Sequence, residues 1–250
     1  MSRPATLRRR TVLRSALTTP FLMAAGVPSA PSAQAQGRPL VDLLLVLAVD
    51  VSGSVDQSRF ELQKHGYAAA FRSADVVQTI QSGAAQSIAV AMMQWTGPDM
   101  QTVVAGWTQV HDAASAGAFA AAVDASERML FAGGTSISGA IDRATSLLAE
   151  ADFTAPRKVI DVSGDGANNR GRPAELARDA AVAAGIVING LPILTLEPDL
   201  DSYYRDSVIG GPGAFVIVIQ NYDQFAEAIE RKLISEIAAT GAARRRLGQE

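Results

Sequence analysis

One stretch of nine residues constrains the fold of this chain more than any other. Residues 41–49 are apolar at every position except Asp42. Near-continuous apolarity over this length is typical of a strand that is buried on both faces of a parallel sheet. The stretch ends at Asp50, where oxygen-bearing side chains replace apolar ones. We therefore expect a central strand with its carboxyl end at Asp50.

Further strands and helices alternate along the chain. Runs of apolar and β-branched residues predict strands over residues 87–95, 102–110, 158–163, 186–194 and 215–219. Helical spacing and composition predict helices over residues 58–72, 118–129, from about 136, over 172–184 and from about 222. This alternation predicts an open, mostly parallel, doubly wound α/β sheet with helices on both faces.

The strand candidates at 87–95 and 102–110 are joined by a short, turn-rich link that includes Gly97 and Pro98. Such a link favours an antiparallel hairpin, and we expect it to form one edge of the sheet. In doubly wound sheets, ligands bind beyond the carboxyl ends of the strands, near the point where strand order reverses. Functional residues are therefore expected just after strands.

The first 35 residues differ from the rest and are typical of a signal peptide. They hold five arginines and no acidic residue, a moderately apolar stretch over residues 15–30, and an Ala-Gln-Ala sequence at 33–35. The segment Arg-Arg-Thr-Val-Leu-Arg at residues 9–14 resembles a twin-arginine signal, and we favour this route over general secretion. We expect cleavage near Ala35 and a periplasmic or secreted product.

Composition excludes several classes of function. Without the leader, 17 Lys and Arg stand against 25 Asp and Glu, and a net charge of −8 argues against binding nucleic acid through bulk charge. The chain has no cysteine, so it has no disulfide, lipid-anchored cysteine or thiol-based metal site. No apolar run after the leader approaches the roughly 20 residues of a membrane span. We expect one domain over residues 36–240 and a solvated basic tail over 241–250.

Three loops that follow strands or precede helices carry oxygen side chains. Asp50, Ser52 and Ser54 stand at alternate positions where the first strand ends, a spacing that can aim three oxygens into one pocket. Thr135 follows two glycines, and Asp165 follows the strand at 158–163. Each piece alone is a weak signal, because such residues often only cap helices or form turns. Three independent loops that offer only oxygen ligands are a stronger one.

Together these residues resemble the metal-ion-dependent adhesion site (MIDAS) of von Willebrand factor A (vWA) and integrin inserted domains. The resemblance extends over residues 40–237 and implies a vWA-like fold. The layout is also similar to an uncharacterised exported proteobacterial branch of that superfamily. The resemblance implies that a metal is held by Asp50, Ser52, Ser54, Thr135 and Asp165.

The resemblance implies Mg2+ in this site, with Mn2+ or Ca2+ as alternatives. Mg2+ prefers six oxygens, and three neutral hydroxyls with at most two carboxylates leave it electrophilic. Families with this site usually bind proteins whose Asp or Glu completes the metal shell, which implies a protein partner of that kind. One position departs from the pattern. The family usually has threonine just before the Asp-Gly pair, whereas this chain has Gly164, so that hydroxyl is missing or moved to Ser163.

Other polar residues are open to simpler interpretations. Asp161 lies inside an apolar strand, and we expect it to be a structural acceptor with a partner. Residues 197–213 leave the carboxyl end of a strand and should lie on the same rim as the metal. Within them, Tyr203, Tyr204 and Arg205 are candidates for partner contact, with ordinary packing over the rim as the alternative.

The sequence is also compatible with two other functions. Residues 164–169 resemble the late metal motif of haloacid dehalogenase-like phosphatases, with Asp50 in the place of their nucleophile. That enzyme needs a carboxylate two residues after the nucleophile, where Ser52 stands, and an aspartate at the end of the late motif, where Asn169 stands. The second alternative is a structural vWA domain with an empty metal site.

Overall fold

A computed structural model describes residues 37–130 and 132–247, in which five strands form one sheet. The order is β3-β2-β1-β4-β5, and every pairing is parallel except that of β2 with β3. The predicted mostly parallel sheet and its antiparallel edge hairpin are therefore confirmed. The strands are β1 (Leu43–Asp50), β2 (Ile88–Trp95), β3 (Gln101–Val110), β4 (Lys158–Gly164) and β5 (Ile186–Pro192).

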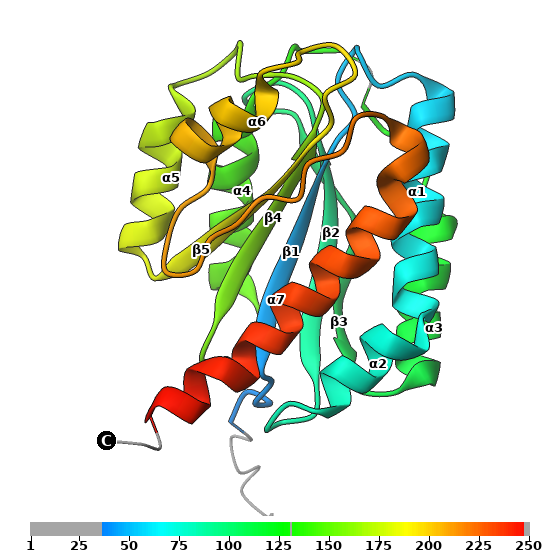
Figure 1. Cartoon of the computed structure of the whole chain (residues 1–250), viewed down its shortest axis with the longest axis vertical. Coiled ribbons are helices and arrows are strands. Elements are labelled where there is room, and N and C mark those ends of the chain that lie inside the picture. The colour runs from blue at the N-terminus through cyan, green and yellow to red at the C-terminus, as the bar shows by residue number, and fades with distance from the viewer. Residues whose placement is uncertain (1–36, 131, 248–250) are drawn as a thin grey trace, which may run out of the picture. The chain divides into compact units, whose positions relative to one another are not determined.

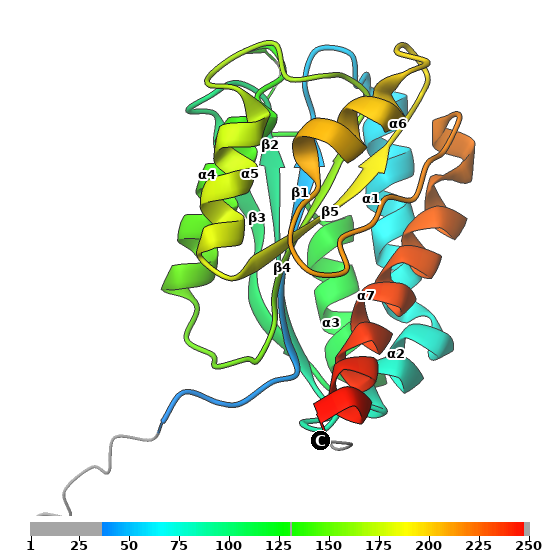
Figure 2. The ribbon, with the colours of Figure 1, turned by 60° about the vertical axis from the view of Figure 1, so that its left-hand side comes forward.

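Helices cover both faces of this sheet (Figure 1). One face carries α1 (Gln57–Arg72), α2 (Ala74–Gln81), α3 (Ala113–Asp124) and α7 (Phe225–Leu247), and the other carries α4 (Ile137–Glu150) and α5 (Ala174–Ala183). Figure 2 shows the two helical layers on either side of the strands. Three short helical turns lie after β5: α6 (Leu200–Tyr203), η1 (Tyr204–Val208) and η2 (Tyr222–Gln224).

The apolar run of β1 serves two cores at once. Leu45 and Leu47 belong to the cluster under α1, α3 and α7, whereas Leu44 and Val46 belong to the cluster under α4 and α5. All four side chains are buried. Because successive residues of a strand point to opposite faces, burial of both faces explains why successive residues of β1 are apolar. The one exception, Asp42, accepts hydrogen bonds from backbone N–H groups of the loop before β2.

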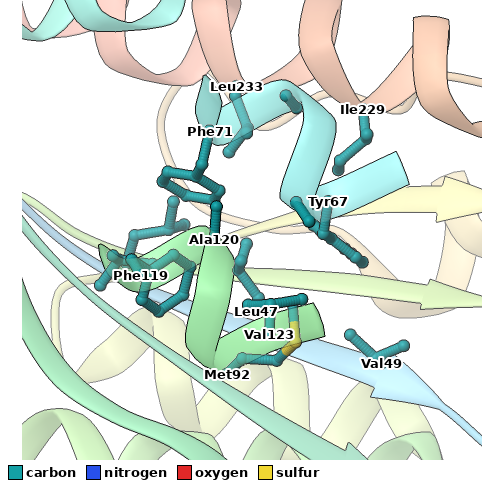
Figure 3. Packing of buried hydrophobic residues seen from close by; sticks show 14 of the residues in the cluster. Leu47, Val49, Tyr67, Phe71, Met92, Phe119, Ala120, Val123, Ile229 and Leu233 are labelled. Carbon is teal, nitrogen blue, oxygen red and sulfur yellow. The ribbon is translucent and has the colours of Figure 1, made fainter. Parts of the chain in front are cut away.

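Aromatic side chains fill the first of these cores (Figure 3). Tyr67 and Phe71 descend from α1 toward the sheet, and Phe119 comes from α3. The rings of Phe71 and Phe119 pack edge to face, with centroids 4.6 Å apart. Ile229 of α7 packs in the same cluster of buried side chains. This packing fixes α1, and with it the loop that joins β1 to α1.

Several predicted boundaries are wrong. No regular strand forms over residues 215–219, which make only isolated bridges to the β5 region, because Pro192 has no N–H to continue a ladder. The helix predicted over 118–129 begins at Ala113, capped by Asp112, and ends at Asp124. The sequence patterns also missed α2, which is separated from the end of α1 by the single residue Ser73.

The remaining expectations concern the two ends of the chain and a membrane span. The predicted signal peptide at residues 1–35 lies outside the described residues. Helix α7 continues to Leu247, so much of the segment expected as a tail is helical. Within residues 37–130 and 132–247, no helix has the length and apolar character to cross a membrane.

Candidate metal centre

The candidate residues gather at the carboxyl ends of β1 and β4. These two strands are parallel neighbours, and Val49 of β1 pairs with Ser163 of β4. Strand order reverses here, since the chain passes from β1 outward to β2 and β3 and then returns to β4 on the other side. Doubly wound sheets bind ligands at this point. The loops that follow both strands lie at the upper end of the molecule in Figure 1.

Oxygens from the first and last motifs are already within contact distance. The Ser52 and Ser54 hydroxyls are 3.2 Å apart, and Ser54 Oγ donates to Asp165 Oδ1 at 2.5 Å. Asp50 Oδ1 accepts the backbone N–H of Ser52 at 2.7 Å. Asp50, Ser52 and Asp165 are almost fully buried. Two segments that are 111 residues apart in sequence thus share one small polar site.

The Thr135 loop joins the same rim through backbone hydrogen bonds. Thr135 N–H donates to Asn169 Oδ1 at 2.9 Å, and its carbonyl accepts the N–H of Asn169 at 2.9 Å. Its hydroxyl oxygen lies 3.7 Å from the point that a Cβ on Gly166 would occupy. The left-handed backbone of Gly133 and Gly134, with φ of 116° and 81°, lets the chain turn into this position. The Thr135 hydroxyl therefore borders the loop that carries Asp165.

The oxygen arrangement fits a small divalent cation. Ligands about 2.1 Å from Mg2+ in octahedral geometry lie about 3 Å from each other, which is close to the separations among Ser52, Ser54 and Asp165. Asp50 Oδ2 is buried and has no hydrogen-bond partner within the described part of the chain. That part also holds no group of three Asp, Glu or His side chains placed for a metal. A cation here would rest on two carboxylates and neutral hydroxyls.

Electrostatics in the site also favour a cation. Burial, together with the charge of Asp165, raises the pKa of Asp50 from 3.8 to about 7. Arg59 is the basic side chain nearest Asp165, at 3.5 Å, and a quarter of that side chain is exposed. A divalent ion between the two carboxylates would remove the repulsion that raises this pKa.

Comparison with known proteins begins with the sequence itself. A family described as "Protein of unknown function (DUF1194)" matches residues 40–241. The chain belongs to the DUF1194 family. No curated protein sequence matches this DUF1194 chain.

Solved structures show that the DUF1194 chain has the vWA fold. Proximal thread matrix protein 1 (PTMP1) of the mussel byssus superposes with a TM-score of 0.58 and 17% identity, over 79% of this chain and 46% of PTMP1. A von Willebrand factor type A protein from Catenulispora acidiphila gives 0.53 and 19%, over 80% and 43%. The pilus adhesin SpaC of Lactobacillus rhamnosus GG gives 0.57 and 14%, over 81% and 31%.

The DUF1194 chain spans less than half the length of each of these proteins. At this level of identity the similarity concerns the fold, and the predicted vWA-like fold is confirmed. One of the PTMP1 structures has a zinc-occupied MIDAS motif. A metal at this motif is therefore observed in a protein of the same fold.

Three side chains of the DUF1194 site were missed from the sequence. Tyr222 donates its hydroxyl to Asp165 Oδ2 at 2.9 Å, and Arg59 packs over the Tyr222 ring at 5.5 Å. Glu197 accepts the N–H of Ala167 at 3.0 Å, beside the Asp165 loop. None of the three belongs to a local motif. Glu197 begins the segment 197–213 that we expected on this rim, whereas only the fold brings Tyr222 and Arg59 there.

The candidates for partner contact divide into two groups. Tyr204 is fully buried, so its prediction as a surface contact is wrong. The π-helical turn η1 directs its ring into the core under α4 and α5. Tyr203 is half-buried and Arg205 is exposed, paired with Asp201, and for these two residues partner contact stays a prediction.

Asp161 has the structural partner that we expected. Its Oδ1 lies 2.7 Å from Nζ of Lys232, a fully buried lysine of α7. Lys232 also lies 2.5 Å from Glu236 Oε1, and Asn189 donates to the same oxygen at 3.0 Å. Asp161 thus anchors α7 to the sheet.

Proposed function

We propose that this protein is a divalent-metal-dependent protein-binding domain with a MIDAS-type site. Asp50, Ser52, Ser54, Thr135 and Asp165 hold Mg2+, or Mn2+ or Ca2+ in its place. A partner protein completes the metal shell with an Asp or Glu carboxylate. The observation that carries this proposal is the contact of Ser54 with Asp165, which joins two of the three motifs at the switch point of the sheet.

The ligand set explains why the bound ion would attract a carboxylate. Ser52 and Ser54 are neutral, and Ser54 and Tyr222 both donate hydrogen bonds to Asp165, which disperse its negative charge. An ion held by so few charged ligands would keep much of its positive charge and would accept a further oxygen ligand from a partner. The shared fold with the adhesin SpaC, and the zinc in the MIDAS of PTMP1, support this interpretation.

A phosphatase-like enzyme is a weaker proposal. The residue in the place of the general acid is Ser52, which lies 3.2 Å from Ser54, and Asn169 uses its side chain to hold the Thr135 loop. Neither can supply the carboxylate that the reaction needs. A structural vWA domain with an empty site is the other alternative, and metal binding separates it from our proposal.

We further propose that residues 1–35 direct export by the twin-arginine route, and that residues 36–240 form the mature binding domain. Replacement of Arg9 and Arg10 by lysine should retain the precursor in the cytoplasm, because that route depends on the arginine pair. Amino-terminal sequencing of the mature protein should begin near residue 36. Unchanged export of the double variant would favour general secretion.

Scanning calorimetry with Mg2+ or a chelator tests the metal. Mg2+ at about 100 times its Kd should stabilise the folded protein by about 2.7 kcal/mol, a rise in Tm on the order of 5–10 °C. Asp50→Ala should abolish that rise. The control is Asp152→Ala, an exposed aspartate near the opposite end of β4, which should keep it. Identical unfolding of the wild type with metal and with chelator would refute the proposal.

Capture of the partner tests the second half of the proposal. Wild-type protein on a resin should retain its partner from a periplasmic extract in Mg2+ and release it on chelation. Asp165→Ala should retain none. Blocking the carboxyl groups of the extract as amides should also abolish retention, because the incoming ligand is an Asp or Glu. Retention that persists after chelation would contradict a metal-mediated contact.

A further inference from the structure

Gly164 borders a small space beside the candidate metal site, and any side chain at position 164 would fill it. A Cβ at this position would lie 2.9 Å from Asp50 Oδ2 and 3.0 Å from the Tyr204 hydroxyl oxygen. Both distances are closer than side-chain carbons normally approach such oxygens. The resemblance to vWA domains leads one to expect threonine here. In this chain, a carboxylate oxygen and a tyrosine hydroxyl border the space instead.

Tyr204 reaches this space from a distant part of the chain. It stands in η1, after β5, and its ring packs in the core cluster that contains Val46 and Ile160. A second glycine makes the approach possible, because a Cβ on Gly190 would lie 2.5 Å from the Tyr204 ring. Two glycines on adjacent strands therefore admit the ring and its hydroxyl to the back of the site.

The two polar atoms at this space are complementary. The Tyr204 hydroxyl and Asp50 Oδ2 are both buried, and neither has a hydrogen-bond partner among the residues that the structure describes. Burial and the charge of Asp50 raise the pKa of Tyr204 well above its ordinary value, so the hydroxyl keeps its proton and can donate. A buried donor and a buried acceptor are each unfavourable unless paired.

Ser163 does not provide the missing hydroxyl. Its Oγ accepts a hydrogen bond from the Tyr67 hydroxyl at 3.3 Å, and Tyr67 belongs to the core on the α1 side of the sheet. The Tyr204 hydroxyl lies with the core on the other side, next to Gly164. Of these two hydroxyls, that of Tyr204 is thus the one that borders the same space as Asp50 Oδ2.

We propose that Tyr204 is a positioning residue for the metal site, whose hydroxyl takes the place of the threonine hydroxyl that Gly164 lacks and orients Asp50 for cation binding. This inference rests on the proposed function, because it assigns Asp50 a metal to hold. It explains why Gly164 and Tyr204 occur together in one chain. A side chain at 164 and a tyrosine at 204 would compete for the same space.

The test is Mg2+ affinity, measured by titration calorimetry and by competition with Mn2+. Tyr204→Phe should weaken Mg2+ binding about tenfold, the lower end of what loss of a partner behind a metal ligand causes. Tyr67→Phe is the matched control, since it removes a buried tyrosine hydroxyl from the other face, and it should bind Mg2+ as the wild type does. Circular dichroism verifies that both variants fold.

Unfolding without metal separates positioning from a merely structural role. In chelator, Tyr204→Phe should have a Tm no lower than that of the wild type, because the hydroxyl that it removes is buried and has no hydrogen-bond partner among the described residues. Unchanged Mg2+ affinity in Tyr204→Phe, or an equal loss in Tyr67→Phe, would overturn the inference. Absence of Mg2+ binding by the wild type would instead reject the proposed function and this inference with it.

Discussion

Two pairs of buried carboxylates border β4, and they differ in what lies between them. Asp161 and Glu236 share the ammonium group of Lys232, at 2.7 Å and 2.5 Å. Among the residues that the structure describes, Asp50 and Asp165 share no such group, and the ion pair of Asp165 is with the partly exposed Arg59 at 3.5 Å. All four carboxylates are almost completely buried. A buried carboxylate pair without a cation is costly.

The contrast distinguishes carboxylates that stabilise the fold from carboxylates that can bind a ligand. Where the protein supplies its own cation, the cluster ties α7 to β4 and β5 and is inaccessible to solvent. Where it does not, the carboxylates lie at the rim of the sheet, Asp50 at the end of β1 and Asp165 just after β4, and are almost as buried as the first pair. The fold thus neutralises one pair through Lys232, and in our proposal a metal neutralises the other.

Removal of the internal cation should have the largest effect. Lys232→Met leaves Asp161 and Glu236 buried together, and should lower the free energy of unfolding by about 3–5 kcal/mol. Urea unfolding measures this loss. Arg231→Met on the exposed side of the same helix removes a surface ion pair with Glu227, and should change stability by less than about 1 kcal/mol. A larger gain in stability from Mg2+ in Lys232→Met than in the wild type would show that the two pairs are not independent.

The same substitution in each pair should have opposite effects. In chelator, Asp50→Asn should raise the free energy of unfolding by about 1 kcal/mol, because it removes repulsion from Asp165. Asp161→Asn should lower it by about 1–3 kcal/mol, because Lys232 loses one of its partners. Mg2+ should then stabilise Asp161→Asn as it does the wild type, and leave Asp50→Asn unchanged. If both substitutions changed the free energy of unfolding in the same direction in chelator, the contrast between the two pairs would be wrong.

The sequence predicts the sheet well, because its signals are local. The apolar run of β1, the short link of the hairpin and the alternation of strands and helices each depend on neighbours in sequence. The same locality explains the errors. Helix α2 was hidden because it follows α1 after the single cap Ser73. Residues 215–219 have strand composition, but their pairing depends on Pro192 in another element.

The candidate site is predicted from sequence in part. Asp50, Ser52, Ser54 and Asp165 follow strands whose order fixes their neighbourhood, and the structure brings them together. Their role as metal ligands stays a prediction. Tyr204 was predicted to lie on the surface, because no local pattern indicates that Gly164 and Gly190 make room for its ring.

The buried lysine was also hidden from sequence analysis. Lys232 lies within a helical pattern next to Leu233, where a charged residue normally marks the solvent-facing side. The pairing with Asp161 depends on how α7 crosses the sheet. A strand aspartate and a helix lysine become partners only when that crossing is known.

The smallest expected effect, taken over one pH unit, is on the pH dependence of stability. Burial, together with the charge of Asp165, raises the pKa of Asp50 from 3.8 to about 7. The folded protein therefore holds more protons than the unfolded chain between these values. In chelator, stability should fall as pH rises through this window, by at most about 1.4 kcal/mol per pH unit from Asp50. Bound Mg2+ would keep Asp50 ionised in the folded protein, so Mg2+ should remove this contribution. Urea unfolding across the window, in chelator and in Mg2+, measures both slopes, and equal slopes would show that Asp50 is not neutralised by the metal.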